Sequence, residues 1–178
     1  MFNELFVFGV SILFFTVVQT NAQSLPTSNK IPNDLQINLD RSACFGICPD
    51  YSLTIESDGK VIFEGRSYTG TKGKIEDKIN RKILEQIISE FEKADFFKLN
   101  NNYVEEKDGC GELWTDNPYE TISIKLNGKT KQVTHYFGCE KVSGNVLERI
   151  INLGEKIDAL VNSDRWVKGW KPDKINEN

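Results

Sequence analysis

The 178-residue chain contains a single histidine, His135, and no block of basic residues. One histidine excludes His-rich metal centres, and a Ser-His-carboxylate site would have to use it although no nucleophile-elbow motif surrounds any serine. A pair of carboxylates that meet in the fold is the other route to catalysis. Because the formal net charge is −4 and no basic block occurs, nucleic acid is not an expected partner.

The chain also lacks an apolar run of about 20 residues, the length that a transmembrane helix needs. Its apolar block, 5–18, is shorter, and Thr20 and Ala22 follow it as small residues suited to a cleavage site. We therefore expect a signal peptide at 1–22, although no lysine or arginine precedes Lys30. A buried N-terminal helix is the alternative. No cysteine lies near the cleavage site, so we do not expect a lipoprotein anchor. We expect a secreted or periplasmic protein with no stable membrane span after cleavage.

The remaining length fits one domain. We expect a flexible leader at 23–33, a single α+β domain at 34–162 and a C-terminal tail at 163–178. Leu35, Ile37 and Leu39 alternate with polar residues, which predicts a short first strand. Trp166 and Trp170, in the tail, are expected to pack back on the domain.

A hairpin is predicted around the Asp58-Gly59 turn. A two-residue loop would place the apolar residues of its two strands on opposite faces. A three-residue loop, Ser57-Asp58-Gly59, pairs Ile55 with Val61 and places all the apolar residues on one face. Because a buried face sets the register, we predict the three-residue loop with a glycine bulge.

A helix is expected after the 70–73 connector, ending near Ala94, because apolar residues recur there at helical spacing. A second hairpin turns at Asn127-Gly128 with Ile122 opposite Val133. A second amphipathic helix follows, capped by Ser143 or Asn145. The fold class is therefore α+β, with a single antiparallel sheet, two helices packed on one face and the order (β)-ββα-ββα.

All four cysteines, Cys44, Cys48, Cys110 and Cys139, lie beyond the predicted signal peptide, and in an exported protein disulfides are expected. Pairing Cys44 with Cys48 and Cys110 with Cys139 is favoured by the tight turn that Gly46 and Pro49 permit. The two crossed pairings remain open, since spacing alone does not determine connectivity.

Two other functions compete for these cysteines. Cys44 and Cys48 next to Pro49 suggest thiol-disulfide exchange, but redox pairs usually have two intervening residues and a helix N-terminus, whereas here there are three and a strand follows. Zinc bound by Cys44, Cys48, His135 and Cys139 has acceptable ligand chemistry. A lone strand histidine is more often a packed, hydrogen-bonded residue.

The polar segment 100–118 is rich in carboxylates and is a candidate for weak cation binding, although it does not follow the helix-loop-helix calcium pattern. The candidate binding residues are Asp108, Glu112, Asp116 and His135. Glu120 belongs to the same acidic stretch. We assign no catalytic residue and no metal ligand, and we expect no cofactor.

Several of these motifs together resemble a known family. The residues concerned are Cys44-Phe45-Gly46-x-Cys48-Pro49-x-Tyr51, then Asp58-Gly59-x-Val61-x-Phe63-x-Gly65, Asp95-Phe96-Phe97-x-Leu99, Lys131-x-Val133-x-His135-Tyr136-x-Gly138-Cys139 and Ile157-Asp158. This pattern is similar to a family of exported bacterial proteins classed as a domain of unknown function. The resemblance covers about 35–160 and implies export and a single α+β domain, but no activity.

With no reaction signature, the chain is expected to be a disulfide-bonded exported domain that acts by binding an unknown protein or small molecule. Thiol-disulfide exchange or a metal-dependent activity centred on the cysteine loop is the alternative. An exposed apolar or aromatic patch would favour a partner site, whereas a concave pocket lined by acids or His135 would favour catalysis.

Overall fold

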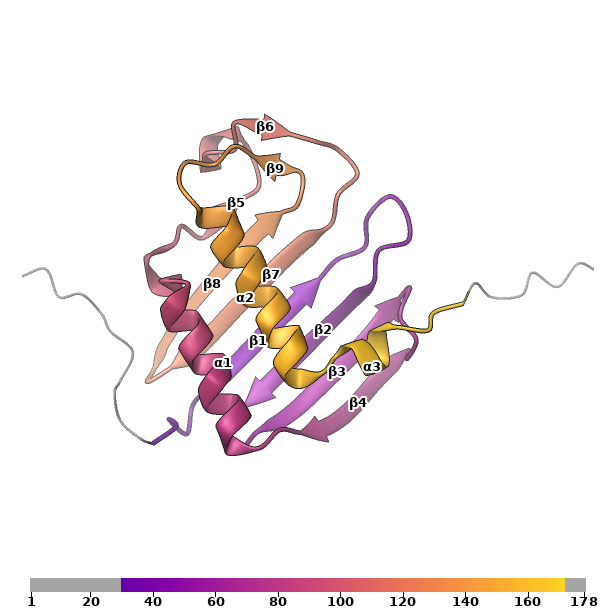
Figure 1. Ribbon diagram of the computed structural model, residues 1–178, viewed down its shortest axis with the longest axis vertical. Helices are drawn as coiled ribbons and strands as arrows, with labels where there is room; N and C mark the ends of the chain where they lie inside the picture. Colours follow the sequence, from indigo (N-terminus) through magenta and orange to yellow (C-terminus); the bar gives the residue numbers. More distant parts are fainter. Residues whose placement is uncertain (1–29, 172–178) are drawn as a thin grey trace, which may run out of the picture.

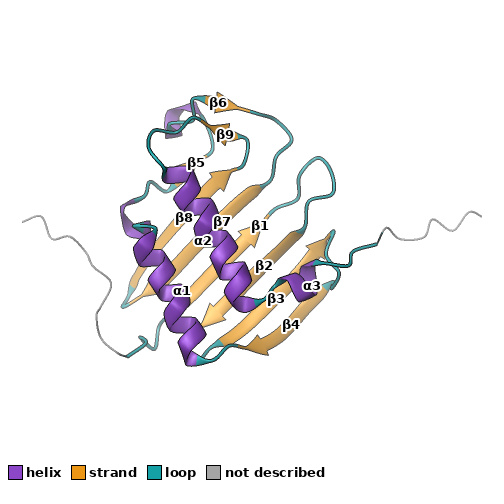
Figure 2. Cartoon of the chain, viewed as in Figure 1, coloured by secondary structure: helices purple, strands orange, loops and turns teal. Residues whose placement is uncertain are grey.

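The computed structural model describes residues 30–171, which form a seven-stranded sheet with helices on one face (Figure 1). The predicted signal peptide lies outside the described residues. Helices α1 (Arg81–Lys93) and α2 (Val146–Val161) lie side by side across the sheet, and the short α3 (Asp164–Val167) follows α2 (Figure 2). No helix within 30–171 is long and apolar enough to cross a membrane.

The main sheet has the strand order β4-β3-β2-β1-β7-β8-β5, and a second sheet pairs β6 with β9. Every neighbouring pair is antiparallel except β5 and β8, which are parallel. The strands are β1 (Gln36–Arg41), β2 (Asp50–Glu56), β3 (Lys60–Ser67), β4 (Gly73–Lys78), β5 (Asn102–Tyr103), β6 (Glu112–Leu113), β7 (Tyr119–Leu126), β8 (Lys129–Tyr136) and β9 (Cys139–Glu140). Two 3-10 turns, η1 (Phe96–Lys98) and η2 (Glu106–Asp108), lie between α1 and β6.

The predicted register of both hairpins is confirmed. In the first, Ile55 pairs with Val61, and Gly59 has the positive φ of 85° that a three-residue loop requires. In the second, Ile122 pairs with Val133 across a two-residue turn in which Asn127 and Gly128 both have positive φ. Strand β1 lies between the hairpins and pairs with both β2 and β7.

The predicted start of the first helix is wrong. Residues 74–78, which we assigned to the helix, belong to strand β4 instead, and Ile75 pairs with Phe63 of β3. The side chain of Asn80 accepts a hydrogen bond from the Ile83 backbone at 3.0 Å and so caps a helix that begins at Arg81. An isoleucine at 75 and another at 79 fit a strand as well as a helix, and only pairing with β3 distinguishes them. The predicted end near Ala94 is confirmed.

The predicted class, a mixture of helices and a mostly antiparallel sheet, is confirmed, but the order (β)-ββα-ββα is wrong. Strand β4 precedes α1, and β5 adds a parallel edge pair beside β8. The polar segment 100–118, for which we predicted no strand, contains β5 and β6. These short strands carry no apolar alternation, so their sequence does not indicate them.

The core lies between the sheet and the helices. Inward-facing side chains of the central strands pack against Leu84, Ile87 and Phe91 of α1 and against Ile150 and Ile157 of α2. Trp166 is also buried, with its ring centroid 5.1 Å from that of Phe63, which confirms its predicted packing on the domain. Within 30–171 the other face of the sheet carries no helix, and most of its side chains are polar.

All four cysteines are in disulfides, Cys44 with Cys48 and Cys110 with Cys139, which is the favoured pairing. The first closes a tight loop between β1 and β2. The second joins the segment after η2 to β9, and both of its cysteines are buried.

We predict that the two disulfides contribute unequally to stability. Replacing Cys110 and Cys139 with serine should lower the free energy of unfolding by about 3–4 kcal/mol, whereas the same change at Cys44 and Cys48 should cost about 2 kcal/mol, because the longer loop gains more chain entropy when it is opened. Urea unfolding of the oxidised variants measures both values. Equal losses, or a larger loss at Cys44 and Cys48, would contradict this account.

Candidate functional site

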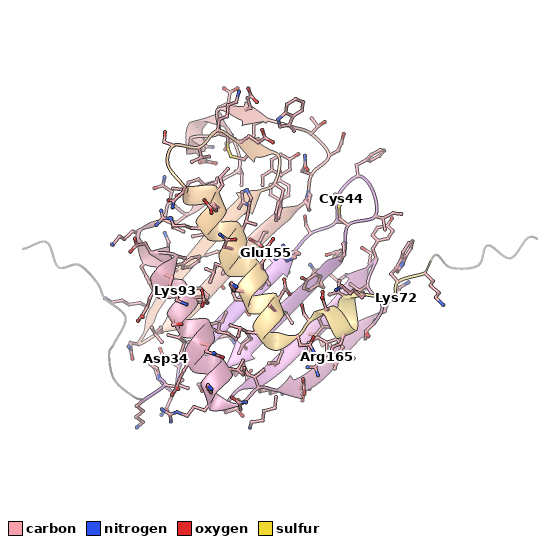
Figure 3. All side chains as sticks on the ribbon, viewed as in Figure 1. Asp34, Cys44, Lys72, Lys93, Glu155 and Arg165 are labelled. Atoms are coloured by element: carbon pink, nitrogen blue, oxygen red, sulfur yellow. A yellow bond between two sulfur atoms is a disulfide. The ribbon has the colours of Figure 1, made fainter. Side chains whose placement is uncertain are left out.

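Large apolar side chains are exposed at one end of the sheet, where β1 and β8 end and β2 and β7 begin. We call this the loop end. Phe45 is 88% exposed, Ile47 70% and Trp114 58%. The exposed apolar patch consists of Phe45, Ile47, Leu113, Trp114 and Tyr119, and it includes every large hydrophobic side chain that is exposed within 30–171. Figure 3 shows the Cys44 loop projecting at this end.

The 42–49 loop that carries Phe45 and Ile47 is tied to the chain before β7. The Ser42 backbone N–H donates to the Tyr119 carbonyl at 2.9 Å, and the Tyr119 N–H donates to Ser42 Oγ at 2.8 Å. Nearer the tip, the Phe45 N–H donates to the Asp116 carbonyl at 3.2 Å. Together with the Cys44–Cys48 disulfide, these bonds hold the loop in one shape.

Arg66 fixes the base of the same loop from the helix-free face of the sheet. Its Nε lies 2.6 Å from Asp50 Oδ1, and its Nη atoms donate to both carboxylate oxygens of Asp40. Its Nη2 also donates to the carbonyls of Arg41 and Tyr51, at 3.1 and 3.2 Å. One guanidinium thus bridges the last residues before the loop and the first residues after it.

The second part of the patch is supported by Tyr136. The Tyr119 and Tyr136 rings lie 4.7 Å apart between centroids, and Tyr136 OH donates to the Trp114 carbonyl at 2.6 Å. The Trp114 N–H donates to the Gly138 carbonyl at 2.8 Å. The backbone on both sides of the Trp114 side chain is therefore held in place while the side chain faces solvent.

Beneath the patch, the inward face of the sheet ends in a row of polar residues. Arg41 pairs with Tyr51 on one side and with Glu120 on the other, and Glu120 pairs with His135. We call Tyr51, Arg41, Glu120 and His135, with Asp158 of α2, the charged row. Each strand residue continues an inward alternation that is apolar farther along its strand.

Arg41 joins the two carboxylates of the charged row. Its Nη1 lies 2.9 Å from Glu120 Oε2, and its Nη2 lies 3.0 Å from Asp158 Oδ2. Tyr51 OH contacts Asp158 Oδ2 at 2.9 Å, and Ser163 Oγ donates to Asp158 Oδ1 at 2.5 Å. This network attaches the end of α2 to the sheet.

Glu120 is fully buried and poorly compensated. Glu120 forms an ion pair with Arg41, but the geometry of this contact is not that of a hydrogen bond. Neither carboxylate oxygen of Glu120 accepts a hydrogen bond from any group within 30–171. Loss of hydration outweighs the attraction of Arg41, and Asp158 and Glu155 add repulsion, so the pKa of Glu120 rises from 4.5 to about 7. Glu120 is therefore partly protonated near neutral pH.

Burial shifts the pKa of His135 in the opposite direction, because the charged form of histidine is a cation. Its side chain is only 1% exposed, and its Nδ1 has no hydrogen-bond partner among the described residues. Burial, with a smaller effect of the Arg41 charge, lowers the pKa of His135 to about 4. The ring is neutral at physiological pH and contacts the Phe137 ring at a centroid distance of 4.8 Å.

The sequence did not single out Arg41, Tyr51, Glu120 and Asp158 as one site. The alternation of side chains along the strands places Arg41, Tyr51 and Glu120 on the inward face, so the sequence could have indicated that these three share a face. Their proximity to Asp158 depends on how α2 crosses the sheet.

The other candidate residues do not meet at one point. Asp108 accepts a hydrogen bond from the Val104 N–H at 3.3 Å, Glu112 pairs with Lys141, and Asp116 is exposed beside the cysteine loop. Asp108 lies in η2, Glu112 in β6 and Asp116 in the loop before β7, all in the segment that precedes β7. His135 lies in the interior below them.

The described residues do not supply the free ligands that the zinc hypothesis requires. No group of three or more His, Cys, Asp or Glu side chains within 30–171 is arranged to hold a metal ion. The cysteines of the zinc hypothesis are bonded to one another as disulfides. A pocket of about 340 Å³ lies between α1 and α2, but it is lined by residues such as Glu90, Arg149 and Lys156 rather than by the charged row.

We predict that Glu120 makes stability depend on pH. Because its pKa is raised in the folded state, the contribution of Glu120 to stability falls as the pH rises from about 4.5 to about 7 and this buried acid ionises. Glu120→Gln cannot ionise, so its free energy of unfolding should rise relative to wild type over that interval, by up to about 3 kcal/mol. His135, whose lowered pKa has the opposite effect, is present in both proteins and largely cancels in the difference. Parallel pH profiles in chemical denaturation would contradict the assignment.

We also predict that the Glu120 carboxylate packs so closely against Gly154 of α2 that no side chain fits at that position. A Cβ at 154 would lie 2.3 Å from Glu120 Oε2, so Gly154→Ala should destabilise the protein by about 1–3 kcal/mol despite the better helix propensity of alanine. In a Glu120→Ala background the same change should be neutral or stabilising. The double-mutant cycle measures this coupling, and additive effects would show that the close approach does not matter.

Two comparisons with known proteins bear on this chain. A search of curated proteins found no match to it. A family model described as a domain of unknown function, DUF6438, matches 35–161, which includes the 42–49 loop, both hairpins and α2. The match covers most of the chain, and the protein therefore belongs to the DUF6438 family.

Proposed function

We propose that this protein is an exported binding module and that the exposed apolar patch is its binding site. The observation that carries the proposal is the position of that patch. Phe45, at 88% exposure, projects from a loop closed by one disulfide and held by Arg66. Loops held rigidly by a scaffold commonly carry function, and a preorganised loop loses less entropy on binding.

The energetic argument supports binding. Leaving a phenylalanine and an isoleucine in water forgoes roughly 1.5–3 kcal/mol of burial for each side chain. Tyrosine and tryptophan, both present in the patch, are enriched among the residues that contribute most to protein interfaces. Folding gains nothing from exposing these side chains, so association is the event that buries them.

Export is part of the same proposal. The two disulfides within 30–171 fit an extracellular location, where such bonds persist. The sequence features that indicate a signal peptide at 1–22 support it further. The acidic residues Asp108, Glu112 and Asp116 belong to the proposed site as the surroundings of the patch.

Thiol-disulfide exchange at Cys44 and Cys48 remains the alternative, because that disulfide lies in an exposed loop. Its surroundings do not favour a reactive thiolate. Cys48 is followed by Pro49 and strand β2, so no helix N-terminus stabilises a negative sulfur. We therefore place the binding function first.

Site-specific photo-crosslinking tests the proposal. A photoreactive amino acid at Phe45 should crosslink a specific partner in the producing cells, because that side chain is buried on binding. The same amino acid at Lys129, an exposed position beside the turn at the opposite end of the sheet, should not. Phe45→Ser with Ile47→Ser should change the free energy of unfolding by less than about 0.5 kcal/mol. Equal crosslinking from both positions, or none from Phe45, would reject the site.

A further inference from the structure

Negative charge is concentrated around the exposed apolar patch. The segments 40–50, 105–120 and 136–141 of the loop end contain nine acidic and three basic residues, and Arg66 of β3 adds a fourth cation there. Because the net charge of the whole chain is −4, the remainder of the protein carries a net positive charge. The acidic excess therefore belongs to this end of the molecule.

Some of this charge is neutralised locally and some is not. Asp40 and Asp50 are paired with Arg66, and Glu112 is paired with Lys141. Glu106, Asp116 and Glu140 are exposed and have no cationic partner among the described residues. Two of these residues adjoin the apolar patch, because the Asp116 carbonyl accepts the bond from the Phe45 N–H and Glu140 follows Cys139, which pairs with Leu113. We call Glu106, Asp116 and Glu140 the acidic rim.

We propose, on the basis of the binding function above, that the partner is a protein segment in which apolar side chains are flanked by lysine or arginine. Phe45 and Ile47 lie on one loop of the patch, and Trp114 and Tyr119 lie on the adjoining one. These loops are joined by the hydrogen bond from the Phe45 N–H to the Asp116 carbonyl. A segment that crosses this junction contacts both sets of side chains and brings its cations to the acidic rim.

The same charges argue against two other occupants. A second copy of the chain would place one acidic rim against another, which is repulsive. An anionic lipid surface attracts basic segments, so it would repel this rim. The experiment below distinguishes these two occupants from a basic protein segment.

The test uses the purified oxidised protein, panned against phage-displayed random 12-residue peptides. We expect enriched peptides that combine aromatic or leucine side chains with a net charge of +2 or more. A synthetic peptide of the most enriched sequence should bind at least tenfold more weakly to the Phe45→Ser, Ile47→Ser variant, and its affinity should fall by at least tenfold between 50 and 300 mM NaCl.

A matched pair of charge variants tests the role of the rim. Glu106→Gln, Asp116→Asn and Glu140→Gln together should weaken binding at least fivefold and reduce its salt dependence. Glu56→Gln, Glu76→Gln and Glu85→Gln remove the same number of charges away from the loop end and should leave affinity within twofold. Equal effects of the two sets would overturn the proposed rim.

The remaining outcomes separate this proposal from the binding function. If acidic or uncharged peptides are enriched through the patch, or if no peptide is enriched, the proposal of a basic partner segment is overturned. The crosslinking result at Phe45 then decides on its own whether the patch is a binding site. Patch-dependent self-association in sedimentation, or patch-dependent binding to phosphatidylcholine vesicles with or without phosphatidylglycerol, would replace the partner. Peptide binding of unchanged affinity in the Phe45→Ser, Ile47→Ser variant would reject the apolar patch as the binding site.

Discussion

The structure depends on the ion pairs of Arg41, the last residue of the central strand. Arg41 holds Glu120 of the neighbouring strand and Asp158 of α2 through separate nitrogens of one guanidinium. A planar, permanently charged fork suits two carboxylates better than a lysine would. Buried charges are costly unless they are paired, so removing Arg41 would leave both carboxylates without their cation. This interaction attaches α2 to the sheet at the end where the loops emerge.

The loop end has an ion-pair network on each side of the sheet backbone. The inward side carries the charged row, and the outward side carries Arg66 with Asp40 and Asp50. Both sets hold the strand residues that flank the 42–49 loop. The apolar side chains of that loop are therefore presented by a backbone that polar interactions have fixed from two directions. A rigid scaffold with an exposed, disulfide-closed loop is the physical basis of the proposed binding function.

Most of the hairpin architecture was predictable because it follows from local rules. Gly59 and Gly128 sit at positions where a turn needs a positive φ, and the buried face then sets the register of Leu53 opposite Phe63. The error at 74–78 arose because Ile75 fits both the helical and the strand periodicity. The candidate site was predicted only in part. The acids near Asp116 were recognised, and His135 was weighed as a packed strand residue. The burial of Glu120 was not recognised, because burial at this end of β7 depends on the helix that covers it.

The sequence by itself determined the two hairpins, the amphipathic faces of α1 and α2 and the inward alternation that ends in Arg41, Tyr51, Glu120 and His135. These features depend on spacing along the chain. Only the tertiary structure decided that β1 lies between the hairpins, that Cys110 reaches Cys139, and that Asp158 meets Arg41. It also decided that Phe45, Trp114 and Tyr119 share one exposed surface. Such contacts join residues far apart in sequence, and they form only when the packing of α2 on the sheet brings the loops to the same end.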